Sequence, residues 1–301
     1  MQALETEFAE YRWFHSIDMG DFATSGRFPP GSAQNVTLFG FMDMVRHIDL
    51  SGMTVLDIGA INGLASFGMK KMGAETVHAT DSSDHKTFRR CAEVLELDVN
   101  YHPRTQIKDF GGIFESGTFD LILCAGVIYH MLNPVSAFIA ARKIIKEGGL
   151  LFMETAYYPD EERAAIFLNS ETAMVDEHYT YSVPTKAALV GLMKLLGFEV
   201  LAIRTIANPN RITILGRAVH PSGISDRSPI LQRIHSRDFV DFEFRIKDVI
   251  PTPASSEIVY AGPRDEQAID HVTYEPDFPL HPERRKRVVG STLWETRDGN
   301  R

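Results

Sequence analysis

Between about residues 36 and 218, short runs of apolar residues alternate with stretches in which apolar residues recur at helical spacing. Apolar runs of about four to eight residues are typical of strands, and a spacing of three or four residues is typical of helices. The run FDLILCAG at 119–126 is apolar almost throughout, as are strands that a parallel sheet buries on both faces. The alternation therefore predicts an α/β domain with a parallel sheet.

The pattern also gives the order of the elements. Strands are expected at residues 54–59, 76–81, 99–103, 119–126, 150–156, 199–206 and 211–219, and helices at 64–73, 85–97, 134–149 and 184–198. This order predicts a doubly wound, mostly parallel, seven-stranded Rossmann-like sheet with helices on both faces, whose last strand pairs with its neighbour. In such sheets ligands bind beyond the carboxyl ends of the strands.

Two flanking regions differ in composition from this core. Residues 1–35 contain a short acidic helix and an aromatic loop rich in glycine and proline, which we interpret as a lid. Residues 219–301 are rich in proline, arginine and aspartate and include the basic run ERRKR at 283–287. We interpret them as a C-terminal extension or small subdomain, through which the protein could form a homo-oligomer. Residues 36–218 would then be the cofactor-binding domain.

Composition narrows the class of protein. The 301 residues are 44% hydrophobic and 24% charged, as in ordinary soluble proteins. No apolar run approaches the roughly 18 residues of a membrane helix, and the two cysteines, Cys91 and Cys124, lie too far apart to suggest a disulfide framework. We therefore expect a cytoplasmic protein without membrane contact. The net charge of −9 argues against a broad nucleic-acid surface without excluding nucleic acid, and the scattered histidines predict no metal site.

The stretch DIGAING, residues 57–63, follows the first predicted strand and contains two glycines. Gly59 permits a tight turn, and Gly63 lets the next helix pack closely while its amide nitrogens face a ligand. About 20 residues after this loop, the second strand ends at Asp81, whose carboxylate can accept both hydroxyl hydrogens of a ribose. The arrangement indicates a cofactor that contains a nucleoside.

Two cofactors fit this arrangement, a nicotinamide dinucleotide and S-adenosylmethionine. A dinucleotide site has a third glycine in the loop, because the backbone must approach the pyrophosphate there. Ile61 occupies that position, and its β-branched side chain would obstruct a diphosphate. Asp57 at the start of the loop would also repel phosphate. The loop therefore favours S-adenosylmethionine.

The fourth predicted strand leads into a second polar motif, CAGVIYHMLNP at residues 124–134. Gly126 gives access to the backbone at the strand end, and Tyr129 and His130 follow it. Because imidazole titrates near neutrality, His130 could orient a nucleophile or accept its proton. The alternative is that His130 caps the next helix and Tyr129 is a packing aromatic.

These motifs resemble class I S-adenosylmethionine-dependent methyltransferases, and more narrowly the group around the bacterial tRNA wobble-uridine carboxymethyltransferases. The resemblance covers roughly residues 11–218 and rests on D-I-G-A-x-x-G, A-T-D, G-V-I-Y-H-M-x-N-P and G-G-L-L-x-x-E-T. The group's W-[FY]-H-x-I-[DE] segment matches residues 13–18, and its Y-x-x-P-[ST] segment matches 181–185. Because appended parts select the substrate and residues 219–301 differ from the group, tRNA is not carried over as the substrate.

The resemblance implies roles for the residues that match. Gly59 and Gly63 would line the methionine part of the cofactor, Asp81 would hold the ribose, and Thr105 or Gln106 would lie near the adenine. The residues predicted to bind the cofactor are Asp57, Gly59, Ala60, Gly63, Asp81, Ser82, Thr105, Gln106, Gly126 and Arg27.

Members of the group that transfer a carboxymethyl group use a carboxylated form of S-adenosylmethionine. The resemblance implies that Tyr129 and Arg211 would hold its extra carboxylate. The third residue that holds it in the group is a lysine, and the matching stretch SGRFPPG offers only Arg27. We therefore predict S-adenosylmethionine and leave the carboxylated form open.

Methyl transfer requires a positioned acceptor and, where the attacking group carries a proton, a base. Candidate catalytic residues are His130, His15, Tyr129 and His178, on segments expected at the mouth of the sheet. Candidate substrate contacts are Trp13, Tyr181 and Arg211.

Three functions are compatible with these residues. The first is a methyltransferase acting on a small metabolite or natural product, which the acidic charge and the loop-built lid favour. The second is an enzyme that transfers methyl or carboxymethyl to a tRNA wobble uridine, supported by Arg211 and the run ERRKR. The third is a cofactor-binding regulatory protein without a catalytic base.

Overall fold

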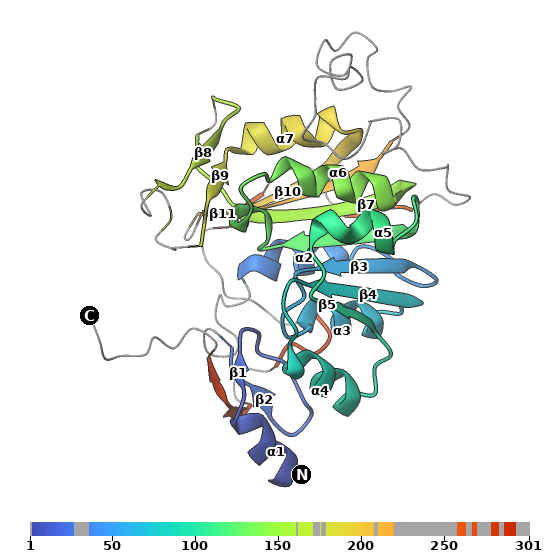
Figure 1. Cartoon of the computed structure of the whole chain (residues 1–301), viewed down its shortest axis with the longest axis vertical. Helices are drawn as coiled ribbons and strands as arrows, with labels where there is room; N and C mark the ends of the chain where they lie inside the picture. The colour runs from blue at the N-terminus through green and yellow to red at the C-terminus, as the bar shows by residue number, and fades with distance from the viewer. Residues whose placement is uncertain are drawn as a thin grey trace.

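Figure 1 shows the computed structural model of the protein, which describes residues 2–26, 36–160, 162–170, 175, 179–207, 210–219, 258–262, 267–269, 278–282 and 286–292. Two predicted site residues, Arg27 and His178, lie outside the described residues. So does most of the C-terminal extension.

An eight-stranded sheet forms the centre, in the order β12-β10-β11-β7-β6-β3-β4-β5. Seven of these strands are the predicted ones: β3 (Thr54–Ile58), β4 (Thr76–Asp81), β5 (Asn100–Pro103), β6 (Phe119–Ala125), β7 (Ile145–Ala156), β10 (Phe198–Ala207) and β11 (Asn210–Ala218). β11 runs antiparallel to β10 and β7, and the other pairs are parallel. The predicted fold is confirmed. The eighth strand, β12 (Gln267–Ile269), comes from the C-terminal extension and pairs with β10.

Helices cover both faces of the sheet (Figure 1). α2 (Val36–Val45), α3 (Leu64–Lys71) and α4 (Lys86–Val94) belong to one hydrophobic core, and α5 (Phe110–Ile113), α6 (Val135–Ile144) and α7 (Lys186–Leu195) to the other. Successive side chains of a strand point to opposite faces, so each central strand supplies both cores. In β6, Leu121 and Leu123 enter the first core, and Ile122 and Cys124 enter the second.

The helix predicted at 134–149 is too long. α6 ends at Ile144, and Ile145 already pairs with Phe119 of β6 as the first residue of β7. Gly148 has φ +81°, which an α-helix cannot contain. α7, in contrast, begins as its sequence indicates, because the Thr185 hydroxyl accepts a hydrogen bond from the Ala188 amide.

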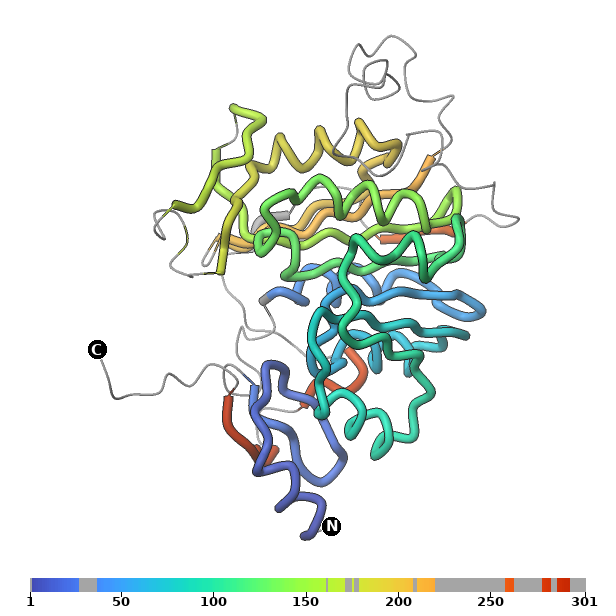
Figure 2. Tube along the Cα trace, viewed as in Figure 1, coloured from blue at the N-terminus to red at the C-terminus, as the bar shows by residue number. Residues whose placement is uncertain are grey.

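The two terminal regions pair with each other through short strands. β1 (Arg12–Trp13) lies parallel to β14 (Ser291–Thr292), and β2 (Ala23–Thr24) lies parallel to β13 (Val288–Val289). Figure 2 shows these blue and red segments side by side. Lys286 also forms an ion pair with Asp18, and Arg287 forms one with Glu5. This part of the extension therefore packs on the N-terminal segment.

The paired termini are fastened to the main domain. Arg90 of α4 binds the Glu7 carboxylate of α1 (Gln2–Ala9) through Nε and Nη2, at 2.8 and 3.0 Å. Phe278 packs so tightly on α3 that a Cβ atom added to Gly68 would lie 2.0 Å from its ring. The first contact ties the N-terminal segment to α4, and the second ties the C-terminal extension to α3.

Within the described part of the chain, no helix has the length and apolar character needed to cross a membrane. The same residues contain no cluster of three or more histidine, cysteine or acidic side chains suited to a metal ion. Cys91 and Cys124 are both buried and free.

Candidate active site

A cavity of about 920 Å³ opens at the carboxyl ends of β3, β4 and β6. It lies at the upper end of the roughly 300–1,000 Å³ typical of ligand pockets. The predicted site residues that line it are His15, Asp57, Gly59, Ala60, Asp81, Ser82, Thr105, Gln106, Gly126, Tyr129, His130 and Tyr181. The cavity therefore unites the glycine loop, the Tyr129–His130 motif and the N-terminal segment.

The loop after β3 is a tight turn held to β4. The amides of Gly59 and Ala60 both donate to the Thr80 carbonyl, at 2.9 and 3.1 Å. Gly59 has φ +78°, and a Cβ atom there would lie 2.5 Å from the Val127 side chain. Ile61 has φ +48°, a left-handed conformation that is strained for a β-branched residue. Such strain is typical of loops that shape a ligand site.

The Asp81 carboxylate, at the end of β4, holds the loop after β3 through hydrogen bonds. Its Oδ2 accepts a hydrogen bond from the Ile61 amide at 3.0 Å, and its Oδ1 accepts one from the Ser83 amide at 2.9 Å. His85 Nε2 lies 3.2 Å from the same Oδ1. Burial by itself would raise the pKa of Asp81, but the hydrogen bonds from His85, Ser83 and Ile61 outweigh it and hold the pKa below its ordinary value. The carboxylate is therefore ionised and can accept hydroxyl hydrogens.

Asp57 lies deeper, at the end of β3. Its Oδ2 accepts a hydrogen bond from the Ser66 hydroxyl at 2.6 Å, which ties it to α3. Burial raises the pKa of Asp57 to about 6, and the nearby Asp81 carboxylate adds to the shift. The residue lines the cavity while its side chain also connects the strand to the helix.

Asn62 connects the cofactor loop to the N-terminal segment, a role that the sequence did not reveal. Its Oδ1 accepts the amide hydrogens of Phe14 and His15, at 2.7 and 3.2 Å, and its Nδ2 donates to the Thr87 hydroxyl at 2.7 Å. The side chain is 1% exposed. Its partners lie 48 and 47 positions away in the sequence, so no local pattern could have identified them.

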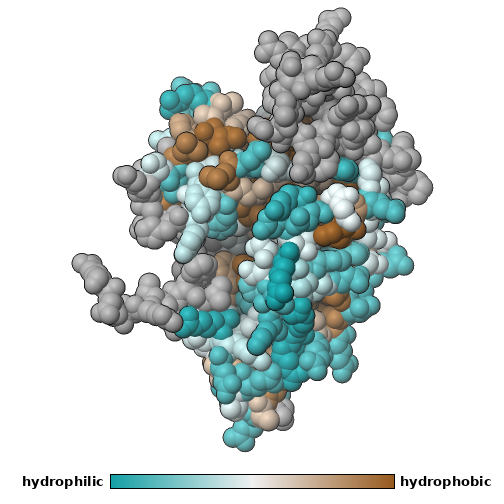
Figure 3. Space-filling model, in the orientation of Figure 1, coloured by the Kyte–Doolittle hydropathy of each residue, from teal (hydrophilic) through white to brown (hydrophobic). Residues whose placement is uncertain are grey.

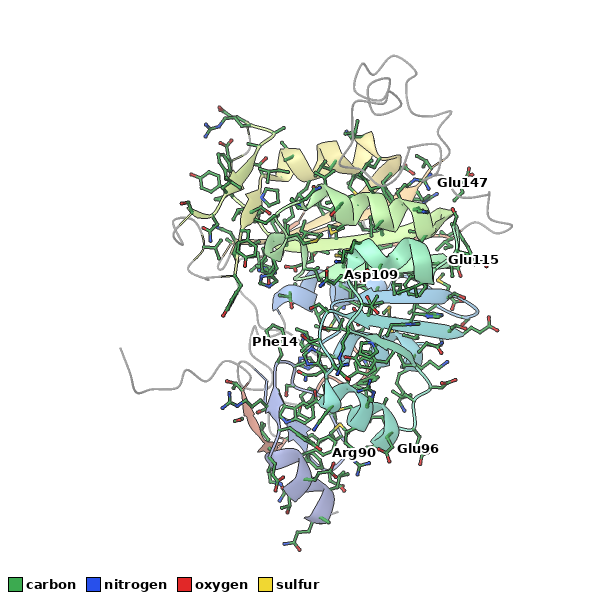
Figure 4. The ribbon with its side chains drawn as sticks, in the orientation of Figure 1. Phe14, Arg90, Glu96, Asp109, Glu115 and Glu147 are labelled. Carbon is green, nitrogen blue, oxygen red and sulfur yellow. The ribbon has the colours of Figure 1, made fainter. Side chains whose placement is uncertain are left out.

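Phe14 and His15 form the part of the cavity wall next to Asn62. Figure 4 shows the Phe14 side chain between the N-terminal segment and the sheet. The two rings meet edge to face, with centroids 4.9 Å apart. His15 is buried, its Nδ1 has no hydrogen-bond partner among the residues that the structure describes, and burial lowers its pKa to about 3. His15 is therefore a neutral imidazole at physiological pH.

The low pKa of His15 predicts a loss of stability in acid. Below pH 6.5 the unfolded chain binds a proton on His15 that the folded chain does not, so the free energy of unfolding falls by up to about 1.4 kcal/mol per pH unit. Urea unfolding at pH 7.5 and 5.5 should show a smaller decrease in the His15→Phe variant than in the wild type. Equal decreases would contradict the assignment.

Tyr129 and His130 form η2 (Ile128–His130) at the end of β6. His130 is exposed to the cavity, and its Nδ1 lies 2.7 Å from the Tyr179 carbonyl. That bond fixes the ring and makes Nδ1 the protonated nitrogen of the neutral form, which leaves Nε2 free to accept a proton. The Tyr129 ring lies 4.1 Å from the His130 ring and 4.7 Å from the Arg211 guanidinium.

Arg211 forms an ion pair with Glu154. Its Nε and Nη2 bind the Glu154 carboxylate at 2.7 and 2.9 Å, and the Gly126 amide donates to the same carboxylate at 2.8 Å. Arg211 is 7% exposed and Glu154 is 0% exposed. The pair fixes the end of β6 to β7 and β11, behind the cavity wall.

Among the predicted site residues that the structure describes, three do not line the cavity. Trp13 is fully buried and stacks on Phe8, with ring centroids 5.3 Å apart, so it belongs to the hydrophobic core. Gly63 faces Phe67 and Phe88, which lie within 3 Å of a Cβ atom placed on it, so it allows packing of α3. Arg211 is the third, for the reason given above.

Comparison with known proteins assigns the fold to a family. The family model for a methyltransferase domain matches residues 34–203, more than half of the chain. The chain therefore belongs to the methyltransferase domain family, and the predicted resemblance and the predicted cofactor, S-adenosylmethionine, are confirmed at that level. The solved [4+2]-cyclase SpnF has a similar fold, with a TM-score of 0.52 and 13% identity over 72% of this chain and 92% of that chain.

Curated relatives match over part of their length. A tRNA U34 carboxymethyltransferase of Campylobacter hominis is 29% identical over 174 residues, which cover 55% of this chain and 59% of the relative. A ubiquinone biosynthesis O-methyltransferase of Xanthomonas oryzae pv. oryzae is 32% identical over 108 residues, which cover 36% of this chain and 45% of the relative. The chain thus spans less than two thirds of the length of these relatives.

The residues of the cavity fit the cofactor of the family. The ionised Asp81 offers a hydrogen-bond acceptor at the end of β4, and the strained Ile61 beside it leaves no third glycine for a pyrophosphate. Thr105 and Gln106 line the same end of the cavity, and His15 and Phe14 line the side next to Asn62. The cavity thus offers both a polar end for an adenosyl group and a largely apolar remainder.

Proposed function

We propose that this protein is an S-adenosylmethionine-dependent methyltransferase that methylates a small-molecule acceptor. The observation that carries the proposal is that the cavity runs from the glycine loop to His15, His130 and Tyr181. A volume of about 920 Å³ provides room beyond the cofactor for a compact acceptor. In this proposal residues 36–218 are the catalytic domain, and the N-terminal segment, of which residues 2–26 are described, covers the site with Phe14 and His15. The two free, buried cysteines suit a reducing compartment such as the cytoplasm.

The chain's own residues would divide the work as follows. Asp81 would accept hydrogen bonds from the ribose, and the turns at Gly59, after β3, and at Gly126, after β6, would allow the backbone to approach the methionine part. When bound, S-adenosylmethionine supplies a methyl carbon activated by its sulfonium. The buried walls exclude water, which favours a displacement that disperses charge.

His130 is the best candidate for the proton acceptor. Its Nδ1 is held by the Tyr179 carbonyl at 2.7 Å, so Nε2 is free to take a proton from the attacking group. His15 suits another task, because its low pKa makes it a poor proton carrier while its neutral ring lines the cavity beside Phe14. We propose that His15 hydrogen-bonds the acceptor, and that Tyr181 contacts it.

A small acceptor is better supported than a tRNA wobble uridine. The net charge is −9, and the basic residues described in the run ERRKR, Lys286 and Arg287, form ion pairs with Asp18 and Glu5. Arg211 is bound by Glu154. Of the basic residues that suggested RNA or a carboxylated donor, those that the structure describes, Lys286, Arg287 and Arg211, are therefore paired with carboxylates of the same chain.

Transfer of labelled methyl from S-adenosylmethionine tests the proposal. The protein is incubated with the labelled donor and a cell extract divided by ultrafiltration into small molecules and RNA. Label should enter the small-molecule fraction and should not depend on ribonuclease treatment. Label in the RNA fraction alone would support the tRNA alternative, and no transfer in either fraction would argue against an enzyme.

The variant His130→Ala is expected to lower turnover at least tenfold while changing the affinity for S-adenosylhomocysteine less than twofold, because the residue serves the acceptor and not the cofactor. Turnover is measured with the acceptor fraction found above, and affinity by calorimetry. A matched control is His47→Ala, a histidine that packs beside Tyr260 outside the cavity. Equal turnover in His130→Ala and the wild type would return His130 to a structural role.

A further inference from the structure

Several of the large apolar side chains that remain exposed lie at or near the mouth of the cavity. The described residues of this kind are Ile113, Leu132, Tyr158, Ile166, Leu168, Tyr179, Tyr181, Val259 and Val288. Six of these, Leu132, Tyr158, Ile166, Leu168, Tyr179 and Tyr181, belong to the segment after η2 or to the region of β8 (Ile166–Leu168) and β9 (Ser182–Pro184). We call these six residues the apolar ledge. Figure 3 shows a brown, hydrophobic patch over β8 and β9.

Hydrogen-bonded structure supports part of the apolar ledge. β8 and β9 form an antiparallel pair in which Leu168 lies opposite Ser182 and Ile166 lies opposite Pro184, so both apolar side chains point to the same face. Leu168 is 73% exposed, whereas the residues of the paired strand β9 are buried. The Asn169 side chain, 8% exposed, binds the carbonyls of Val175 and Thr180 at 3.0 Å.

The ledge is continuous with the cavity. Leu132, 82% exposed, and Tyr181, 41% exposed, belong to the ledge and also line the cavity. The Tyr181 amide donates to the Tyr129 carbonyl at 2.7 Å, and the Tyr179 carbonyl holds the ring of His130. On the face of the strand pair that carries Leu168, the Ser182 hydroxyl donates to the Met131 carbonyl at 3.3 Å, which places this face of the pair next to the segment that contains Leu132.

We propose that the acceptor is amphipathic, with its reacting group in the cavity and an apolar chain or ring lying along the ledge. This inference rests on the proposed function and names its substrate class. Exposed apolar area contiguous with a ligand pocket is typical of binding surfaces. An acceptor that stops at the cavity mouth would leave Ile166 and Leu168 in water, whereas an apolar extension would cover them. Each methylene that becomes buried should tighten binding about threefold to fourfold.

A series of alkylphenols tests the proposal with defined probes. 4-Methylphenol, 4-butylphenol and 4-octylphenol are titrated by calorimetry into protein saturated with S-adenosylhomocysteine. Affinity should rise at least tenfold from methyl to butyl, as the chain reaches Leu132, and at least tenfold again from butyl to octyl. The variant Ile166→Ser/Leu168→Ser should keep the first increase and lose the second. The control Ile113→Ser/Val259→Ser, exposed apolar residues outside the ledge, should keep both.

Several outcomes would overturn the proposal. One is equal affinity for the three phenols, and another is the same gain from butyl to octyl in both double variants. A wild-type dimer in sedimentation that Ile166→Ser/Leu168→Ser converts to a monomer would assign the ledge to a second copy of the chain. Binding to phosphatidylcholine–phosphatidylglycerol vesicles that the same variant abolishes would assign it to a membrane surface. Failure to bind S-adenosylhomocysteine would instead sink the proposed function, so the two failures are distinguishable.

Discussion

Replacement of Asp81 by alanine is expected to weaken the binding of S-adenosylhomocysteine more than tenfold. The change removes the carboxylate that the cavity offers to a ribose, a contact with a charged group for which about 1.5–3 kcal/mol is typical. It also releases the amides of Ile61 and Ser83, which the carboxylate holds at 3.0 and 2.9 Å. Ile61 is already strained at φ +48°, so the loop should relax when its amide loses this partner.

Asp84 provides the matched control for this measurement. Its carboxylate lies three positions after Asp81, pairs with Arg89 and Arg104, and does not line the cavity. Asp84→Ala should bind S-adenosylhomocysteine within twofold of the wild type in the same calorimetric titration. Unchanged affinity in Asp81→Ala, with both variants folded by circular dichroism, would remove the ribose contact from the account.

The variant Arg211→Met is expected to destabilise the protein by about 3–5 kcal/mol, because it leaves a buried carboxylate without its counter-ion. Glu154 is 0% exposed and is held by Arg211 through two hydrogen bonds, at 2.7 and 2.9 Å. Urea unfolding at pH 7.5 measures the loss. If Arg211 were instead unpaired in the free protein and available to the carboxylate of a ligand, its removal would change the stability of the free protein little.

A double variant separates the pair from the packing. Arg211→Met/Glu154→Leu removes both charges, so most of the lost stability should return, and the Gly126 amide keeps its 3.3 Å bond to the backbone carbonyl of residue 154. Arg104→Met is the surface control, because the Arg104 side chain is 79% exposed and lies 3.7 Å from its partner Asp84, and this variant should cost less than about 1 kcal/mol. A double variant as unstable as Arg211→Met would show that the loss comes from packing.

The fold could be predicted because its signals are local. The uninterrupted apolar run of β6 requires burial on both faces, and the structure divides its side chains between two cores. Gly59 and Asp81 end adjacent parallel strands, so sheet geometry alone brings them to one edge. Ile61 could be used to distinguish S-adenosylmethionine from a dinucleotide because its signal is also local: the conformation of a single turn determines which residues approach a ligand.

Other features depend on contacts that sequence patterns do not encode. Asn62 gains its role only when the N-terminal segment folds back over the loop. Trp13 belongs to an aromatic motif, yet the packing of α1 buries it against Phe8. Arg211 matched a ligand-binding position, but Glu154 on the neighbouring strand β7 binds it first. β12 pairs with β10 although some 60 residues separate it from that strand.

Native mass spectrometry tests the central claim most directly, namely that the cavity beyond β3 accepts an adenosyl methyl donor and excludes a dinucleotide. The protein is sprayed with S-adenosylhomocysteine and NAD at equal concentrations, alongside Asp81→Ala. The account predicts a one-to-one complex with S-adenosylhomocysteine in the wild type, little of that complex in the variant and no NAD complex in either. A stable complex with NAD, or S-adenosylhomocysteine bound equally by both proteins, would contradict it.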